Sequence, residues 1–439
     1  MNIIIRKWKY FLLALVLVMG FWLRSNNLYT WPRLGATFDE YAWTWLGISI
    51  LQNHIPTSWS PHPEYTKAKD IIYQKTHFRL VTPYLEHPPL FGLIAGEYAL
   101  LSGVKDMFHV DLQHIRGLAV LLGVFSVFMV FLFTKELYGE NVGLLASFLY
   151  AIIPSIAIGS RLVENENFFI PFFLLALFFT SRYLRTKRNV FYIVTIIICG
   201  LLTLAKVPWA TATIAIFLIL LSQKMYKRAF LFVLGVLPIF GLFFVWGLYW
   251  DSHLFFSLWS LQLNRYDIAF NSVYALFTYP VLTDREFLDG WIYFGWFAIF
   301  LLVAKDFKKH IFIVLPFLAY FLVYVYAIPN ELGHGWYRYP FYPFFVIAIA
   351  LFVKEYFNKN YLLTFFFLLL TGLSMLGQSW TQAFGFSFMV FRFFLGLYGI
   401  TLLPLFFPKT QKLSHAISYI SLLSIFLLTI WSVFGYNEQ

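Results

Sequence analysis

Cysteine and charged residues are scarce in this sequence. Cys199 is the only cysteine, and 12% of the 439 residues are charged. One cysteine excludes an internal disulfide and any metal site built from several thiolates. Soluble proteins contain roughly 25% charged residues, whereas 60% of this chain is hydrophobic and 22% is aromatic. The composition therefore predicts an integral membrane protein.

Several motifs are also missing. The sequence has no G-x-x-x-x-G-K-[ST] or G-x-G-x-x-G stretch, so nothing supports direct use of a nucleotide, and it has no H-E-x-x-H zinc motif. The net charge of +11 comes from short basic groups scattered between apolar runs. This distribution gives no basic patch, so nucleic acid is not an expected partner. The basic, apolar N-terminus lacks a small-x-small cleavage site and is expected to remain as a membrane anchor.

The apolar runs are long enough for many membrane crossings. A crossing helix needs about 17–25 apolar residues. This criterion predicts an all-α polytopic protein, with residues 1–439 forming one integral membrane domain of about thirteen transmembrane helices. The expected helices are 8–26, 116–134, 141–159, 167–184, 190–205, 207–222, 229–249, 291–304, 311–328, 341–353, 361–379, 387–407 and 415–434. Two long loops connect them, at 27–115 and 250–290.

One shorter apolar segment decides the orientation. Residues 88–103 contain Glu97 and begin with two prolines, so we expect an interfacial or re-entrant helix. If this segment does not cross, the basic runs RKWK, TKEL, RYLRTKR, KMYKR, KDFKK, KEYFNK and PKTQK all face the cytoplasm, as the positive-inside rule requires. Most acidic residues then lie on the opposite side. The sequence thus predicts a multi-pass protein of the plasma or inner membrane, with a polar site outside the cytoplasm.

The stretch ATFDEYAWTW, residues 36–45, places two adjacent acids at the start of the first long loop. Tyr41, Trp45 and Ile48 recur at helical spacing, which predicts an amphipathic helix lying on the membrane. Thr37 and Glu40 match a capping box. Capping explains one acid of the pair. It does not explain Asp39.

Other ionisable and aromatic residues reach the same predicted face. They are Glu86, His87, Arg116, Arg161, Glu164, Glu166, Lys206, Arg265, Arg338 and Tyr337. Each has an ordinary explanation when taken alone: cations at helix ends extend to lipid headgroups, and aromatic residues form interfacial belts. Lys206 is harder to explain, because it sits in a very short turn between two apolar helices, where ionisable groups are functional candidates.

The residue types favour chemistry on a lipid-borne group. Outside the cytoplasm there is no nucleotide supply, so an activated group would arrive on a lipid phosphate. A phosphate needs Arg or Lys to bind it and to stabilise its charge as it leaves, and a hydroxyl acceptor needs a carboxylate base. No cofactor is certain, although Glu164 and Glu166 with Glu86 or His87 could bind a divalent metal through oxygen ligands.

The order of these motifs resembles a known family. The series is Phe38-Asp39-Glu40, His87-Pro88-Pro89-Leu90, Arg116, Arg161 with Glu166, and Lys206. It resembles the C-type membrane glycosyltransferases that use polyprenyl-phosphate sugars, in particular the dolichyl-phosphate-mannose protein O-mannosyltransferases and the lipid A aminoarabinose transferases. The resemblance extends over roughly the first half of the chain, with weaker echoes near Arg265 and Tyr337.

This resemblance implies the C-type fold and an inverting sugar transfer to a hydroxyl. Asp39 would be the catalytic base, assisted by Glu40. The donor phosphate would be bound by Arg116, Lys206, Arg265 and Arg338. Sugar or acceptor contacts, or support of these groups, would come from Glu86, His87, Arg161, Glu164, Glu166 and Tyr337. The partners would be a polyprenyl-phosphate sugar, membrane lipids and an acceptor that is a protein, a lipid or a glycan.

Two other functions compete with this interpretation. A transporter or flippase of lipid-linked sugars would place ionisable groups near mid-membrane on broken helices, often in repeated halves. Here the expected mid-span regions are almost free of charge, Glu97 and Arg392 being the main exceptions. An oligosaccharide ligase would be expected to carry a soluble acceptor-binding domain after the last helix.

Overall fold

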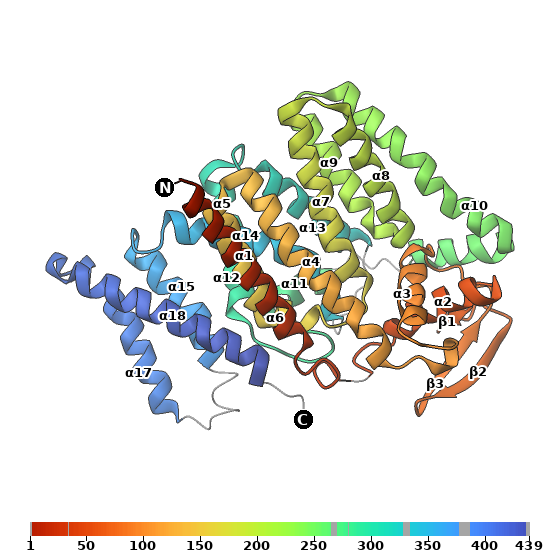
Figure 1. Ribbon diagram of the computed structural model, residues 1–439, viewed down its shortest axis with the longest axis horizontal. Helices are drawn as coiled ribbons and strands as arrows, with labels where there is room; N and C mark the ends of the chain where they lie inside the picture. The colour runs from red at the N-terminus through yellow and green to blue at the C-terminus, as the bar shows by residue number, and fades with distance from the viewer. Residues whose placement is uncertain are drawn as a thin grey trace.

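The computed structural model describes residues 2–33, 35–264, 270–279, 281–327, 334–376 and 387–435. Most of this chain is helical, with one small sheet in the first long loop (Figure 1). The α-helices and strands are α1 (Asn2–Ser25), α2 (Asp39–Asn53), β1 (Ser58–Trp59), β2 (Ala68–Tyr73), β3 (Thr76–Val81), α3 (Leu90–Leu101), α4 (Leu112–Tyr138), α5 (Glu140–Ile152), α6 (Pro154–Gly159), α7 (Asn165–Thr186), α8 (Asn189–Ala205), α9 (Ala210–Ser222), α10 (Tyr226–Asn264), α11 (Phe270–Thr278), α12 (Gly290–Asp306), α13 (Ile311–Ala327), α14 (Tyr342–Glu355), α15 (Tyr361–Met375), α17 (Phe388–Gly399) and α18 (Gln411–Gly435). Short 3₁₀ segments are η1 (Met107–His109), η2 (Val207–Trp209), η3 (Gly335–Phe341), η5 (Ile400–Leu405) and η6 (Pro408–Thr410).

The structure has the apolar helices that the sequence predicts, but fewer of them are long enough to cross a membrane. Within the described residues, seven helical segments are long and apolar enough to cross a membrane: Trp8–Ser25, Leu112–Tyr138, Asn165–Thr186, Tyr226–Asn264, Gly335–Glu355, Phe388–Leu405 and Pro408–Gly435. Six further apolar helices are shorter, between 10 and 17 residues. The protein is therefore an all-helical polytopic membrane protein in its apolar part, with fewer full-length spans than the thirteen expected.

One expected span, 141–159, is not a continuous helix. It is divided into α5 and α6 at Pro154, which has no N–H to donate to the carbonyl of Tyr150. Arg24 of α1 replaces the lost donor: its guanidinium donates to the carbonyls of Tyr150 and Ala151, at 3.1 and 3.2 Å. A buried arginine thus stabilises a helix break that proline produces.

The first long loop forms a compact unit. The expected amphipathic surface helix is wrong, because α2 is buried on every side from Glu40 to Ser49. Helix α3 packs closely against it. The carbonyl oxygen of Gly92 lies 1.9 Å from the place where a Cβ on Gly47 would stand, so only glycine permits this approach. With 12 residues, or about 18 Å of length, α3 is too short to span a bilayer.

A three-stranded sheet with the order β1-β3-β2 covers α2 and was not expected from the sequence. Strands β2 and β3 pair antiparallel from Ala68↔Val81 to Tyr73↔Thr76. Their turn, Gln74-Lys75, has positive φ at both residues, a geometry that usually selects Asn-Gly. Because the turn lacks those residues, the hairpin signal is weak. Phe78 of β3 packs edge-on against Trp45 of α2.

Ion pairs join several of the basic runs. Lys9 and Lys135 both pair with Glu140, and Lys305 pairs with Glu355. The turn between α9 and α10, which carries another basic run, lies at the top of the view, at the ends of these two helices that are away from α2, α3 and the sheet (Figure 1). The side of the membrane on which each end lies stays a prediction.

Candidate active site

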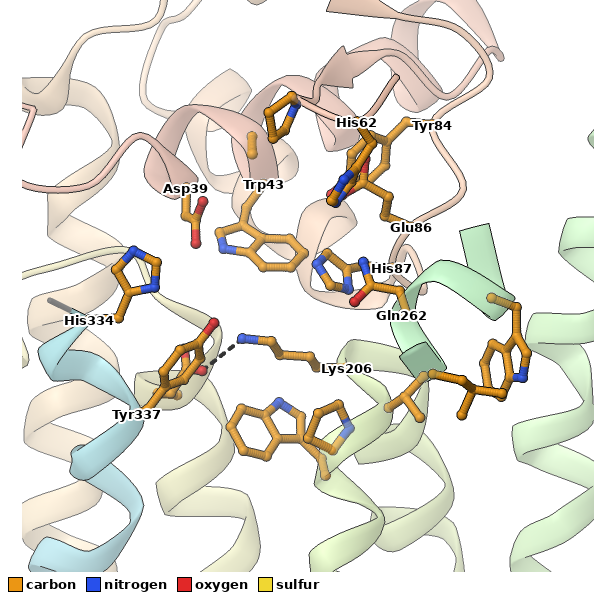
Figure 2. A pocket seen from close by; sticks show the side chains of 18 of the residues that line it. Asp39, Trp43, His62, Tyr84, Glu86, His87, Lys206, Gln262, His334 and Tyr337 are labelled. Atoms are coloured by element: carbon orange, nitrogen blue, oxygen red, sulfur yellow. Dashed lines mark hydrogen bonds and ion pairs between the residues drawn. The ribbon is translucent and has the colours of Figure 1, made fainter. Parts of the chain in front are cut away.

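A cavity of about 440 Å³ lies below α2 and is closed by residues from several helices (Figure 2). Its walls come from the first loop, the turn between α8 and α9, the end of α10, α13 and η3. The lining residues are Asp39, Ala42, Trp43, Trp59, Pro61, His62, Tyr84, Glu86, His87, Glu166, Lys206, Val207, Pro208, Trp209, Ala210, Trp259, Gln262, Leu263, Val323, His334 and Tyr337. Segments far apart in sequence therefore meet at one concave site.

Lys206 and Glu166 form a buried ion pair at this cavity. Lys206 Nζ lies 2.7 Å from Glu166 Oε1, and the two residues are 7% and 0% exposed. The ammonium also lies 5.1 Å from the ring centre of Tyr337 and 5.6 Å from that of Trp209, within cation–π range. Burial acts to lower the pKa of Lys206, but Glu166 outweighs it, and the pKa of Lys206 is raised above its ordinary value.

Asp39 is the first residue of α2 and lines the same cavity. Its backbone N–H donates to Thr37 Oγ1 at 3.1 Å. The expected capping box is wrong: Phe38 occupies the N-cap position without a side-chain cap, and the Glu40 side chain points elsewhere. Figure 2 shows Asp39 and His334 at one side of the cavity, with Lys206 below them. A carboxylate and a cation thus face the same space.

Glu40 and Arg116, by contrast, are structural partners. Both are completely buried, and Arg116 Nη2 lies 2.9 Å from Glu40 Oε2. Arg116 also donates to the carbonyls of Leu28 and Pro32, each at 2.7 Å, and Glu40 Oε1 accepts from the N–H of Val163. Neither residue lines the cavity. The expected roles of Arg116 in phosphate binding and Glu40 in catalysis do not fit this placement, because their polar atoms are occupied by each other and by the backbone.

Two other predicted residues, Arg161 and Arg338, do not line the cavity. Arg161 is 0% exposed and donates to the carbonyls of Trp31 and Leu23, each at 2.7 Å. Arg338 lies beside a smaller separate pocket with Asp289 and donates to the carbonyl of Ala275 at 3.3 Å. Neither lines the cavity with Lys206. Direct donor contact by either arginine is therefore not supported.

Glu164 is the remaining acid of the ENEN stretch. Its Oε1 accepts a hydrogen bond from Thr37 Oγ1 at 2.8 Å, and the residue is 0% exposed. Burial, reinforced by the charges of Asp39 and Glu166, raises the pKa of Glu164 well above its ordinary value. Glu164 does not line the cavity, so its placement fits a supporting group rather than a second base.

The opposite wall combines the selected residues Glu86 and His87 with His62, Tyr84 and Trp43, which the sequence analysis did not select. His62 Nε2 lies 3.6 Å from Glu86 Oε2, and the His87 ring lies 5.2 Å from that of Trp43. Figure 2 shows His62, Tyr84 and Glu86 together at this side. Trp43 was detectable, because it lies four residues after Asp39 and therefore on the same helical face. The position of His62 depends on how the loop folds and has no sequence signal that we recognise.

Two further predictions concern Arg265 and a divalent metal site. Arg265 lies outside the described residues, directly after the cavity-lining end of α10. Within the described part of the chain, no group of three His, Cys, Asp or Glu side chains is arranged to hold a metal ion. Glu166 instead pairs with Lys206, and Glu164 binds Thr37. Those contacts do not support the metal site drawn from Glu164, Glu166, Glu86 and His87.

Known proteins resemble this chain in part of its sequence and in its fold. Residues 86–250 match the family described as dolichyl-phosphate-mannose-protein mannosyltransferase. The fold is similar to that of ArnT from Cupriavidus metallidurans bound to undecaprenyl phosphate, with a TM-score of 0.60 and 12% identity over 98% of this chain and 77% of that one. The apo state of the same enzyme gives a TM-score of 0.57 and 13% identity over 98% and 78%. No curated protein matches the sequence.

A second similar fold is the apo oligosaccharyltransferase of Archaeoglobus fulgidus, with a TM-score of 0.54 and 13% identity. The alignment covers 98% of this chain and 56% of that enzyme. The chain therefore shares the fold of these membrane enzymes. The family match covers residues 86–250, which is less than half of the chain. The resemblance seen in the sequence is confirmed.

Proposed function

We propose that this enzyme transfers a sugar from a polyprenyl-phosphate donor to a hydroxyl acceptor by a single inverting displacement. Asp39 is the base and Lys206 binds the donor phosphate. The observation that carries this proposal is that Asp39, Lys206 and Glu166 line one cavity although they are far apart in the chain. A base and a phosphate-binding cation are the two groups that such a transfer needs.

Lys206 is the only Lys or Arg among the described residues that line the cavity. Its ammonium faces Glu166, Tyr337 and Trp209. A donor phosphate entering this space would share Lys206 with Glu166, so that the cation stabilises the phosphate as negative charge develops on it. Arg265 follows the cavity-lining residues Gln262 and Leu263 in sequence and stays a prediction as a second phosphate ligand.

The sugar would lie between Lys206 and the far wall. Trp43 offers an apolar ring face, and Glu86 and His87 offer hydrogen-bonding groups to sugar hydroxyls. Asp39 takes the proton of the acceptor hydroxyl as its oxygen bonds to the anomeric carbon. The bond between that carbon and the phosphate oxygen breaks on the opposite face. The transition state then resembles the oxocarbenium ion of glycoside cleavage, with the acceptor in place of water.

The cavity is proposed to open outside the cytoplasm in the plasma or inner membrane. It is formed by the first long loop, away from the basic α9–α10 turn, and basic connections face the cytoplasm. The acceptor is a protein, a lipid or a glycan that carries a free hydroxyl. The second function to be tested is transfer of an intact lipid-linked sugar across the membrane, with no glycosidic bond broken.

The decisive experiment uses the purified protein and a panel of polyprenyl-phosphate sugars. Mass spectrometry would follow the loss of each donor, the release of polyprenyl phosphate and the anomeric configuration of the product. We expect one donor class to be consumed and Asp39→Asn to prevent its consumption. Movement of intact donor across vesicles with equal rates for wild type and Asp39→Asn would instead establish a flippase and overturn the proposal.

A further inference from the structure

The Asn165 side chain is completely buried, yet it makes two hydrogen bonds to the segment that carries Lys206. Its Nδ2 donates to the carbonyl of Ala205 at 2.8 Å, and its Oδ1 accepts from Trp209 Nε1 at 2.7 Å. The amide orientation follows from the chemistry of its partners, because a carbonyl oxygen can only accept and an indole N–H can only donate. Asn165 thus contacts the residues on both sides of Lys206.

The carbonyl of Ala205 needs this external donor. Helix α8 ends at Ala205, and the N–H that would continue the helix, that of Trp209, donates to the carbonyl of Lys206 instead. Pro208 has no N–H to offer. An unpaired backbone carbonyl in a buried turn costs free energy comparable to a lost hydrogen bond. Asn165 therefore satisfies this carbonyl at the point where Lys206, in an extended conformation with φ −160° and ψ 135°, interrupts the helix.

The second hydrogen bond fixes a wall of the cavity. Trp209 lines the cavity and is 1% exposed. Its ring stacks on Phe169 at a centroid distance of 4.2 Å and an interplanar angle of 13°, while Lys206 Nζ lies 5.6 Å from its centre. The stack fixes the plane of the indole. The bond to Asn165 fixes its rotation within that plane.

Asn165 lies between two acids whose partners are also site residues. Glu164 accepts from Thr37, whose hydroxyl also accepts from the N–H of Asp39. Glu166 pairs with Lys206. Residues 164–166 therefore link the segment that carries the base to the turn that carries the cation. Because α7 begins at Asn165, this link is built into the end of a long rigid helix.

We propose that Asn165 is a positioning residue for donor binding: its carboxamide joins the two ends of the Lys206 turn and thereby holds the ammonium at the phosphate site. Asn165 does not line the cavity and acts through Lys206 and Trp209. This inference rests on the proposed role of Lys206. The sequence analysis selected the neighbouring residues Glu164 and Glu166 but not Asn165.

The test measures binding of undecaprenyl phosphate, with undecaprenol as the phosphate-free control lipid, to the full protein in lipid nanodiscs. Asn165→Ala is expected to weaken undecaprenyl phosphate binding by about tenfold, the scale of the two neutral hydrogen bonds that it removes, and to leave undecaprenol binding unchanged. Asn167→Ala is the matched control, because Asn167 lies in the same helix and, among the described residues, donates to the carbonyls of Gly159 and Leu162. It should bind both lipids like the wild type.

A second variant protects the test against misfolding. Trp209→Phe keeps an aromatic ring to stack on Phe169 and removes the indole N–H together with one ring of the indole, so we expect it to fold and to lose about two- to tenfold in undecaprenyl phosphate affinity. In a Lys206→Ala background, Asn165→Ala should produce no further loss. The inference is wrong if Asn165→Ala and Trp209→Phe both bind undecaprenyl phosphate like the wild type. It is also wrong if these variants lose as much affinity for undecaprenol, or if Asn165→Ala has its full effect in the Lys206→Ala background.

The same measurements separate this inference from the proposed function. If Lys206→Ala binds undecaprenyl phosphate as tightly as the wild type, Lys206 is not the phosphate ligand and the proposed function loses that assignment. If Lys206→Ala weakens binding while Asn165→Ala and Trp209→Phe do not, the phosphate assignment stands and the positioning role of Asn165 is wrong.

Discussion

Lys206 Nζ lies 2.7 Å from Glu166 Oε1, although 40 residues separate them in the chain. Glu166 is in the first turn of α7, where an acid suits the helix dipole, and Lys206 follows the last residue of α8. The short α6–α7 and α8–α9 turns therefore approach each other at one end of the helices. Their contact places an ion pair at the floor of a cavity that Asp39, Glu86 and several aromatic residues also line.

Asp39→Asn should abolish sugar transfer without changing the fold. The substitution keeps the size of the side chain and removes the carboxylate that accepts the proton. General-base catalysis contributes about 10²–10⁴-fold, and we expect a loss in kcat of that order. Binding of undecaprenyl phosphate should be retained, because Asp39 is not a phosphate ligand. Normal turnover in Asp39→Asn would show that another group is the base.

Lys206→Ala should impair donor use more than acceptor use. Removing a charge-assisted contact to phosphate is expected to raise the donor KM by about tenfold or more, while the acceptor KM stays close to that of the wild type. Steady-state kinetics with each substrate varied in turn would measure this difference. Lys69→Ala, on the exposed strand β2, is the control and should leave both constants unchanged.

Breaking the Glu40–Arg116 pair should act on stability. Arg116→Ala leaves the buried carboxylate of Glu40 without its counter-ion, which typically costs about 3–5 kcal/mol. A lower unfolding temperature in detergent should accompany reduced yield of folded protein. Lys309→Ala removes a partner from the exposed pair with Glu355 and should change the temperature little, since such pairs contribute about 0–1 kcal/mol. Equal effects of the two variants would contradict the structural role of Arg116.

Glu164 should make stability depend on pH in a defined direction. Its pKa in the folded protein is raised well above the ordinary 4.5, so the folded state holds the proton more tightly than the unfolded state. Its stabilising contribution is therefore complete below pH 4.5 and is lost as the pH rises through the folded pKa. Glu164→Gln keeps an oxygen for Thr37 and cannot ionise.

The unfolding temperature of the wild type should accordingly decline more steeply with increasing pH than that of Glu164→Gln. Thermal unfolding of both proteins in the same detergent, from pH 4.5 upward, measures the difference in slope. Parallel curves over that range would show that Glu164 does not titrate in the way its surroundings indicate.

Sequence reasoning found the elements of the site better than it found their roles. Asp39, Glu166 and Lys206 were all selected, because ionisable residues at the ends of apolar helices are rare enough to notice. Arg116 was selected on the same ground and assigned to the phosphate. Its true environment depends on Glu40 and on the carbonyls of Leu28 and Pro32, which the chain brings to it from up to 88 residues away. No local pattern reports such a contact.

The sequence by itself determined that this is a polytopic membrane protein with its acids and a few cations at the helix ends, because apolar length and charge distribution follow directly from composition. Only the tertiary structure decided which of two adjacent acids reaches the cavity. Consecutive residues on a helix point about 100° apart, so Asp39 can face the open cavity only while Glu40 turns inward to Arg116. Which way the pair turns is fixed by the packing around α2.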